Sequence, residues 1–97
     1  MKVSLKELRD QVVVITGASS GIGRVTAREA ARRGAKVVLV SRDETDLRQL
    51  VEEIRAAGGM ATHVVADVAD RTALAAAAET AEQTFGGLDT WVNNAGV

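Results

Sequence analysis

The chain has 97 residues, of which 46% are hydrophobic and 26% charged, a size and balance that suit one small globular domain. A net charge of −1 with scattered arginines excludes the strong positive field that attracts nucleic acid or an anionic membrane, so we expect neither partner. With no cysteine, a single histidine and no apolar run of about 18 to 20 residues, the sequence excludes a disulfide framework, a metal cluster and a membrane span. Along the chain, residues 1–10 lack the apolar core of a secretion signal, and we therefore expect a cytoplasmic protein.

Four short apolar runs alternate with three segments of helical periodicity. The apolar runs predict buried strands over Val12–Thr16, Lys36–Ser41, Ala61–Val68 and Leu88–Asn93. Helix C-caps are expected at the glycines that follow each helical segment, namely Gly34, Gly58-Gly59 and Gly86-Gly87. The strands are therefore expected to be joined through helices, without hairpins.

Each helical segment carries an apolar stripe that we expect to face the sheet. The three stripes are Ile22, Val25, Thr26, Ala30 and Ala31; Leu47, Leu50, Val51 and Ile54; and Leu74, Ala78, Ala81 and Phe85. Asp70 precedes the third stripe and is expected to cap that helix.

This βαβαβαβ pattern predicts the α/β class, with a parallel sheet and right-handed crossovers. The expected architecture is a Rossmann-type doubly wound parallel sheet, partial, with four strands in the order 3-2-1-4. The first two helices would then cover one face and the third helix the other. The carboxyl ends of the first and fourth strands would meet at the switch point, where such sheets bind ligands.

A glycine-rich turn links the first strand to the first helix. Residues 12–23 read V-V-V-I-T-G-A-S-S-G-I-G, so the turn has both flanking elements that a phosphate cradle needs. Glycines let the backbone turn tightly and approach a ligand, and the N–H groups at the start of a helix favour an anion. The turn therefore predicts an anion-binding site.

Polar or glycine residues stand at all four predicted strand ends. They are Thr16-Gly17, Ser41-Arg42, Asp67-Val68 and Asn93-Asn94-Ala95-Gly96. Because the carboxyl ends of parallel strands share one edge of the sheet, we expect these groups to line a common crevice.

Two of these segments resemble the signature motifs of a known family. Residues 16–23, T-G-A-S-S-G-I-G, resemble the T-G-x-x-x-G-x-G cofactor motif of the short-chain dehydrogenase/reductase family, and residues 93–96 resemble its N-N-A-G motif. The resemblance covers the chain from about residue 10. It implies that residues 1–97 are the N-terminal dinucleotide-binding part of a single Rossmann domain.

The resemblance also implies roles for individual residues. The turn would be formed by Gly17, Gly21 and Gly23, and the adenosine and pyrophosphate side lined by Ser19, Ser20 and Ile22. Asp67 would accept a hydrogen bond from the adenine amino group, and the Val68 backbone would contact the ring. The ribose would lie beside Asn94, Ala95 and Gly96, while Asn93 would tie the central strands together. Simpler alternatives are that Asp67 caps the following turn and that the asparagines are turn residues.

Arg42 bears on which dinucleotide is bound. NAD-binding folds usually place an acid at the end of the second strand to bind the ribose 2′-OH, whereas this chain has Ser41-Arg42 there. A guanidinium suits a 2′-phosphate, so we expect NADP(H) in preference to NAD(H). Asp43 opposes this choice if its side chain turns inward. Arg24 is either a second phosphate contact or part of a solvated helix face.

The family's catalytic residues are missing from these 97 residues. The resembled enzymes use a Tyr-x-x-x-Lys pair, an upstream Ser and a further Asn, but this chain has no Tyr, and its lysines are Lys2, Lys6 and Lys36. We therefore predict no catalytic residue, no turnover by the chain alone, and a catalytic half outside it. The complete protein is expected to be a homo-oligomeric NAD(P)-dependent oxidoreductase that transfers hydride between a nicotinamide cofactor and a carbonyl or alcohol. The alternative is a non-catalytic nucleotide-binding or sensory Rossmann module.

Overall fold

The computed structural model describes residues 7–19 and 21–94. Strands and helices alternate along the chain after a short 3-10 helix, η1 (Leu8–Asp10). In order they are β1 (Val12–Thr16), α1 (Gly21–Arg32), β2 (Lys36–Ser41), α2 (Glu44–Ala56), β3 (Met60–Val65), α3 (Arg71–Phe85) and β4 (Thr90–Asn93).

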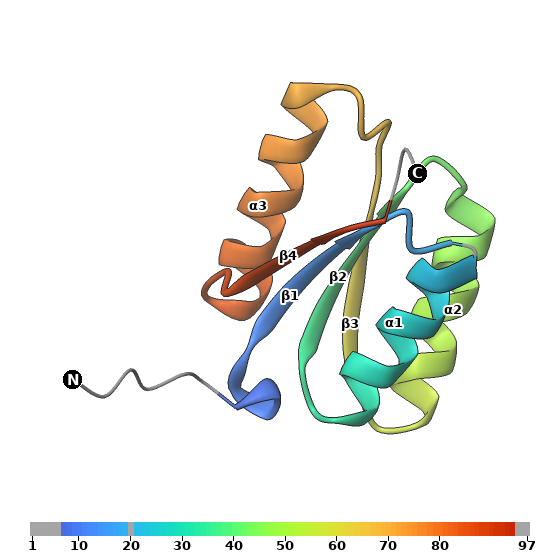
Figure 1. Ribbon diagram of the computed structural model, residues 1–97, viewed down its shortest axis with the longest axis vertical. Coiled ribbons are helices and arrows are strands. Elements are labelled where there is room, and N and C mark those ends of the chain that lie inside the picture. Colours follow the sequence, from blue (N-terminus) through green and yellow to red (C-terminus); the bar gives the residue numbers. More distant parts are fainter. Residues whose placement is uncertain (1–6, 20, 95–97) are drawn as a thin grey trace.

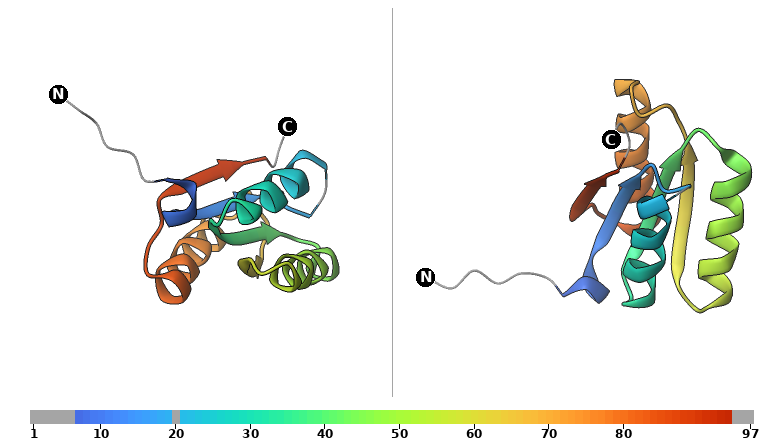
Figure 2. Two further views of the ribbon diagram at one scale, coloured as in Figure 1. Left: turned by 90° about the horizontal axis from the view of Figure 1, so that it is seen from below. Right: turned by 45° about the vertical axis from the view of Figure 1, so that its right-hand side comes forward.

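The four strands form one parallel sheet in the order β3-β2-β1-β4 (Figure 1). Both the fold class and the strand order predicted from the sequence are confirmed. The helices lie on opposite faces, with α1 and α2 on one side and α3 on the other (Figure 2). This is the Rossmann-like doubly wound arrangement, and it gathers the carboxyl ends of all four strands at one edge.

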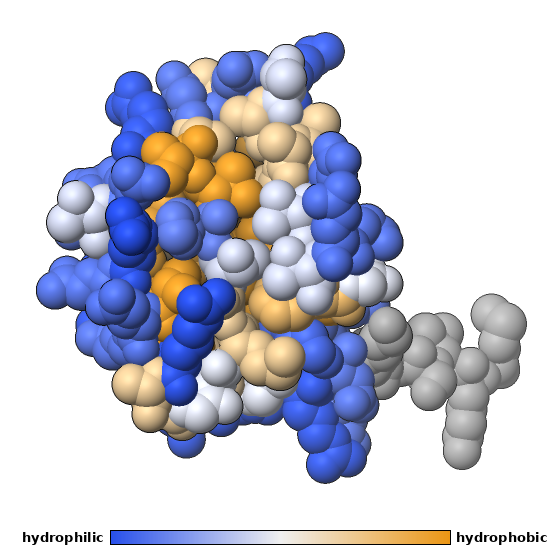
Figure 3. All heavy atoms as spheres, turned by 180° about the vertical axis from the view of Figure 1, so that it is seen from behind, coloured by the Kyte–Doolittle hydropathy of each residue, from blue (hydrophilic) through white to orange (hydrophobic). Residues whose placement is uncertain are grey.

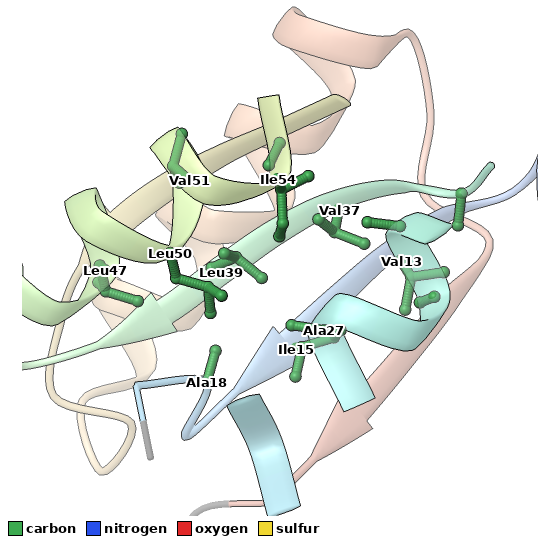
Figure 4. Close-up of a cluster of buried hydrophobic side chains, with 14 residues drawn as sticks. Val13, Ile15, Ala18, Ala27, Val37, Leu39, Leu47, Leu50, Val51 and Ile54 are labelled. Carbon is green, nitrogen blue, oxygen red and sulfur yellow. The ribbon is translucent and has the colours of Figure 1, made fainter. Parts of the chain in front are cut away.

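The core consists of two clusters, one on each face of the sheet. Val13 and Ile15 of β1 point toward α1 and α2, where they join Leu39, Leu50 and other apolar side chains (Figure 4). Val12 and Val14 point the other way and pack with Val38, Val40 and α3. Because side chains alternate along a strand, a strand buried on both faces is a nearly continuous apolar run, as β1 is from Val12 to Ile15.

Three strand boundaries differ from the predicted ones, and the smallest difference is the start of β3 at Met60 instead of Ala61. β3 ends at Val65, not Val68, because Asp67 bends the chain by accepting a hydrogen bond from the Ala69 N–H at 2.9 Å. β4 begins at Thr90, not Leu88, and just before it the Asp89 carboxylate accepts a hydrogen bond from the Val12 N–H at 2.8 Å. At the end of β3 and before the start of β4, an aspartate side chain accepts a backbone hydrogen bond, and the strand stops short there although the apolar sequence pattern continues.

The predicted inner face of α1 is wrong in part. Ile22 and Val25 are 78% and 63% exposed, whereas the sheet is contacted by Ala27 and its neighbours along α1. The buried residues of this helix are Gly23, Ala27, Ala30 and Ala31. Small residues allow a helix to lie close to the strands. The hydrophobicity of Ile22 and Val25 does not indicate the distance between α1 and the sheet, so it gives the wrong inner face.

The third helix shows a smaller difference of the same kind. Its fully buried residues are Ala77 and Ala81, of which only Ala81 was predicted to lie inside. Leu74, Ala78 and Phe85 are half-buried instead. The predicted caps are present: the Asp70 side chain accepts from the Thr72 N–H, and Gly86 ends the helix with φ 81°, a conformation that favours glycine.

Both edges of the sheet are open within the described residues, since β3 pairs only with β2 and β4 only with β1. Apolar surface is visible from behind, on the side of the molecule where β3 lies between α2 and α3 (Figure 3). Met60 and Val65, at the two ends of β3, are about half exposed. Among residues 7–19 and 21–94, the helices are too short or too polar to cross a membrane.

We predict that Leu50→Ala lowers the free energy of unfolding by about 2–5 kcal/mol, because the fully buried Leu50 side chain fills the core beneath α2. Urea denaturation followed by circular dichroism measures this change. Gln49→Ala, on the exposed side of the same helix, is the matched control and is expected to stay within about 0.5 kcal/mol of the parent. Equal effects of the two substitutions would contradict the placement of this core.

Candidate functional site

A cleft of about 360 Å³ lies at the carboxyl ends of the strands, beside the glycine-rich turn. It is lined by Gly17, Ser19, Ser41, Arg42, Asp43, Ala66, Asp67 and Val68. Five of these residues, Gly17, Ser19, Arg42, Asp67 and Val68, are site residues predicted from the sequence. The structure therefore brings the turn and the ends of β2 and β3 together in one cavity.

The glycine-rich turn has a backbone geometry that strongly favours glycine. Gly17 and Gly21 have φ of 65° and 56°, in the left-handed region that other residues rarely adopt. A Cβ on Gly23 would lie 2.0 Å from the Gly17 carbonyl oxygen, so α1 starts in direct contact with the turn. A Cβ on Gly21 would meet nothing within 4 Å, which leaves the outer side of the turn open to a ligand.

Side-chain and backbone contacts fasten the turn to the rest of the molecule. The Ala18 N–H donates to the Val40 carbonyl at 3.3 Å, and Arg24 donates from Nη1 to the Ser19 carbonyl at 3.4 Å. Arg24 is not among the cleft-lining residues. Its observed contact is to the backbone of the turn, and a contact with a phosphate stays a prediction.

The end of β4 is tied to the end of β1. Thr16, which is buried, donates from its hydroxyl to Oδ1 of Asn93 at 2.8 Å, the strand-tying role that the resemblance implies for Asn93. The Asn94 N–H donates to the Thr16 carbonyl at 3.3 Å. The side-chain Nδ2 of Asn94 is buried and has no hydrogen-bond acceptor among the described residues.

At the end of β2, two oppositely charged neighbours have different tasks. The Asp43 carboxylate caps α2 by accepting from the Asp46 N–H at 3.0 Å, while its own N–H donates to the Ser41 hydroxyl oxygen at 3.0 Å. Asp43 therefore caps α2 through Oδ1 and also belongs to the residues that line the cleft. The Arg42 side chain is 79% exposed and extends beside the cleft.

Asp67 uses its two carboxylate oxygens separately. Oδ1 accepts from the Ala69 N–H at 2.9 Å, which is the turn-capping role considered as an alternative from the sequence. Oδ2 lies 3.8 Å from Nη1 of Arg42. The capping contact leaves Oδ2 facing the cleft. The same side chain can therefore cap the turn through Oδ1 and accept a hydrogen bond from a ligand through Oδ2.

The remaining predicted residues are placed as follows. Ile22 is exposed and does not line the cleft, and Asn94 lies at the end of β4, outside the lining as well. Ser20, Ala95 and Gly96 lie outside the described residues. Ser41 lines the cleft, as expected for a residue at a converging strand end. Asp43 and Ala66 line it too but are not among the predicted binding residues, and their positions just after two strand ends are the signal that identifies them.

The clearly shifted pKa values belong to ion pairs on the helices. Hydrogen bonds from Arg32 and Arg33 lower the pKa of Glu29 to about 2, and a hydrogen bond from Arg28 lowers the pKa of Glu53. The Arg28 to Glu53 contact joins α1 to α2. These groups stabilise the helix layer and lie away from the strand-end cleft.

A larger hollow, of about 440 Å³, lies between η1, α1 and β4. Its lining includes the apolar side chains of Leu8, Val13, Val25 and Val92. We assign the functional site to the smaller strand-end cleft because an open cradle, a guanidinium and a carboxylate converge there, as polar groups do in ligand sites. No group of three or more His, Asp or Glu able to hold a metal is present in the described part of the chain.

The cleft has the features that a dinucleotide requires. Open backbone at Gly21 and the start of α1 suits a pyrophosphate, and Arg42 suits a further phosphate at the neighbouring strand end. Asp67 Oδ2 offers an acceptor for an amino group. These residues therefore fit an adenine dinucleotide.

Comparison with known proteins gives a consistent result. A family model described as short chain dehydrogenase matches residues 11–97. The chain is 56% identical to the uncharacterized oxidoreductase YxnA of Bacillus subtilis, over 99% of this chain and 27% of that protein. It is 46% identical to L-rhamnose 1-dehydrogenase (NAD(P)(+)) of Azotobacter vinelandii, over 93% of this chain and 37% of that protein.

Solved structures show the same relationship. L-sorbose reductase from Gluconobacter frateurii, complexed with NADPH and L-sorbose, superposes with a TM-score of 0.84 at 40% identity, covering 90% of this chain and 34% of its own. A metagenomic short-chain oxidoreductase in complex with NADP gives a TM-score of 0.82 at 46% identity, and the match covers 91% of this chain and 40% of that protein. The chain thus spans about a third of the length of these proteins.

We predict that Gly23→Ala lowers the free energy of unfolding by about 1–3 kcal/mol, because the new methyl group would overlap the Gly17 carbonyl and displace the turn or the helix. Chemical denaturation measures the loss. Gly87→Ala is the matched control, since a Cβ there meets nothing within 4 Å. Should both variants be as stable as the parent, the close approach of α1 to the turn would be disproved.

Proposed function

The chain belongs to the short-chain dehydrogenase/reductase family, and we propose that it is the N-terminal dinucleotide-binding part of an NADP(H)-dependent oxidoreductase. The full-length protein then transfers hydride between the nicotinamide cofactor and a small carbonyl or alcohol substrate, and works as a homo-oligomer. The observation that carries this proposal is the open glycine-rich turn beside Arg42 in a single cleft.

Residues of the turn and of the strand ends would hold the cofactor. They are Gly17, Ser19, Ser20, Gly21, Ile22 and Gly23 in the turn, and Arg42, Asp67, Val68, Asn94, Ala95 and Gly96 at the strand ends. The backbone at the start of α1 binds the pyrophosphate, and Asp67 Oδ2 accepts from the adenine amino group. When bound, the nicotinamide ring supplies or accepts the hydride.

Arg42 supports NADP(H) over NAD(H). The end of β2 presents this exposed guanidinium, while the neighbouring carboxylate, Asp43, is committed to capping α2. A guanidinium binds a phosphate dianion through charge-assisted hydrogen bonds, worth about 1.5–3 kcal/mol. Two of the similar structures hold NADPH or NADP, and the Azotobacter relative is named for both cofactors.

Proton transfer must come from residues outside these 97. Hydride transfer at a carbonyl needs a proton donor beside the reacting oxygen, and the family's tyrosine has no counterpart in a chain without Tyr. The serines of the turn belong to the cofactor side in this proposal. The chain therefore binds and orients the cofactor, while the rest of the full-length protein contributes the acid and the substrate pocket.

We predict that Arg42→Ala weakens NADP⁺ binding to the full-length protein about ten- to a hundredfold, because a charge-assisted contact to the 2′-phosphate is lost. Binding of NAD⁺, which lacks that phosphate, is expected to change by less than about twofold. Isothermal titration calorimetry measures both. Arg48→Ala removes an exposed positive charge on α2 and serves as the control. A parent protein that binds the two cofactors equally would disprove the preference.

The 97-residue chain by itself is predicted to oxidise no NADPH with any carbonyl substrate, because it contains no proton donor equivalent to the family's tyrosine. The loss of NADPH absorbance over time measures this, with the full-length protein as the positive control. Turnover by the purified chain would show that its own residues supply the acid.

A further inference from the structure

The cleft contains an ion pair that the binding roles above leave unexplained. Nη1 of Arg42 lies 3.8 Å from Oδ2 of Asp67. The same guanidinium is proposed to bind the 2′-phosphate, and the same oxygen is proposed to bind the adenine amino group. Each partner is therefore occupied by the other before the dinucleotide arrives.

The backbone places these two residues side by side at the edge of the sheet. Ser41 and Val65 are paired at the ends of β2 and β3, and the Ala66 N–H donates to the Ser41 carbonyl at 2.9 Å, which extends the pairing one residue further. Arg42 follows Ser41, and Asp67 follows Ala66, as the next residue of each of these two segments. Their side chains consequently start from neighbouring positions on a rigid edge.

The carboxylate has little freedom to turn away. Its Oδ1 accepts from the Ala69 N–H at 2.9 Å, so Oδ2 is the oxygen left to face Arg42. The other carboxylate of the cleft, Asp43, accepts from Asp46 at the start of α2. The ion-pair contact of the Arg42 guanidinium is with Asp67, at 3.8 Å, so Asp67 is the acid placed to compete for that guanidinium.

We propose that Asp67 is a specificity-tuning residue that acts through Arg42: its carboxylate holds the guanidinium in the free protein and thereby weakens the preference for 2′-phosphorylated dinucleotides. The inference rests on the proposed function, because it concerns the same cleft. A 2′-phosphate must draw Arg42 away from Asp67, whereas a ligand with a free 2′-OH does not. Since both side chains are more than half exposed, the effect is limited to about two- to fivefold in affinity.

The test is Asp67→Asn in the full-length protein. An asparagine Oδ1 can still accept from the Ala69 N–H, so the turn is retained, while the negative charge is lost. Dissociation constants for NADP⁺ and NAD⁺ are measured by calorimetry, and their ratio is compared with that of the parent. A changed adenine contact affects both ligands alike and cancels in the ratio. We expect the ratio to shift about two- to fivefold toward NADP⁺.

Two further variants distinguish the ways in which this result can arise. Asp70→Asn removes an equal charge three residues away, at a carboxylate that caps α3, and is expected to leave the ratio unchanged. In an Arg42→Ala background, Asp67→Asn is expected to have no effect on the ratio. If the shift persists without Arg42, the carboxylate acts on the phosphate directly and the positioning role is overturned.

The outcomes also separate this inference from the proposed function. If the parent prefers NADP⁺ but Asp67→Asn gives the same ratio as Asp70→Asn, the cofactor proposal stands and the tuning role is overturned. If the parent binds neither dinucleotide, the cofactor proposal fails and the tuning role fails with it. If the parent binds both equally, the proposed NADP(H) preference fails, and the change in the ratio on Asp67→Asn still decides the tuning role.

Discussion

The contact between Gly23 and the carbonyl oxygen of Gly17 is the constraint on which the rest of the site depends. With no side chain at position 23, α1 begins directly against the end of β1, and its first N–H groups come to the switch point of the sheet. A Cβ there would push the helix outward and open the turn. The cradle is thus a consequence of close packing between a strand and a helix, and binding and folding share the same requirement for glycine.

The sequence predicts the strand order well because burial on both faces leaves a simple pattern. Residues 12–15 are all apolar, which only a central strand covered on two sides requires. With helices between the strands and no hairpin signal, the rules of handedness leave few topologies. The converging strand ends follow from the topology, so Gly17, Arg42 and Asp67 are identifiable as neighbours before any coordinates are known.

Other features depend on distances that the apolar pattern does not encode. Ile22 and Val25 are the most hydrophobic residues early in α1, yet Ala27 faces the sheet because the helix lies too close for larger side chains. Hydrogen-bond partners are equally hidden: the sequence leaves open whether Asp43 faces the cleft, and the N–H of Asp46 determines that it caps α2. Asp67 combines two roles that appear as alternatives from the sequence alone.

The cleft owes its shape to backbone hydrogen bonds that continue the sheet beyond its strands. Ala18 donates to Val40, Ala66 to Ser41, and the N–H of Asn94 to the carbonyl of Thr16. Each bond fixes the first residues of a loop relative to the neighbouring strand, so the turn and the loops that begin with Arg42 and Asp67 keep their relative positions. Exposed groups can then be well placed and still free to exchange partners, which is what a site must allow when a charged ligand replaces an internal ion pair.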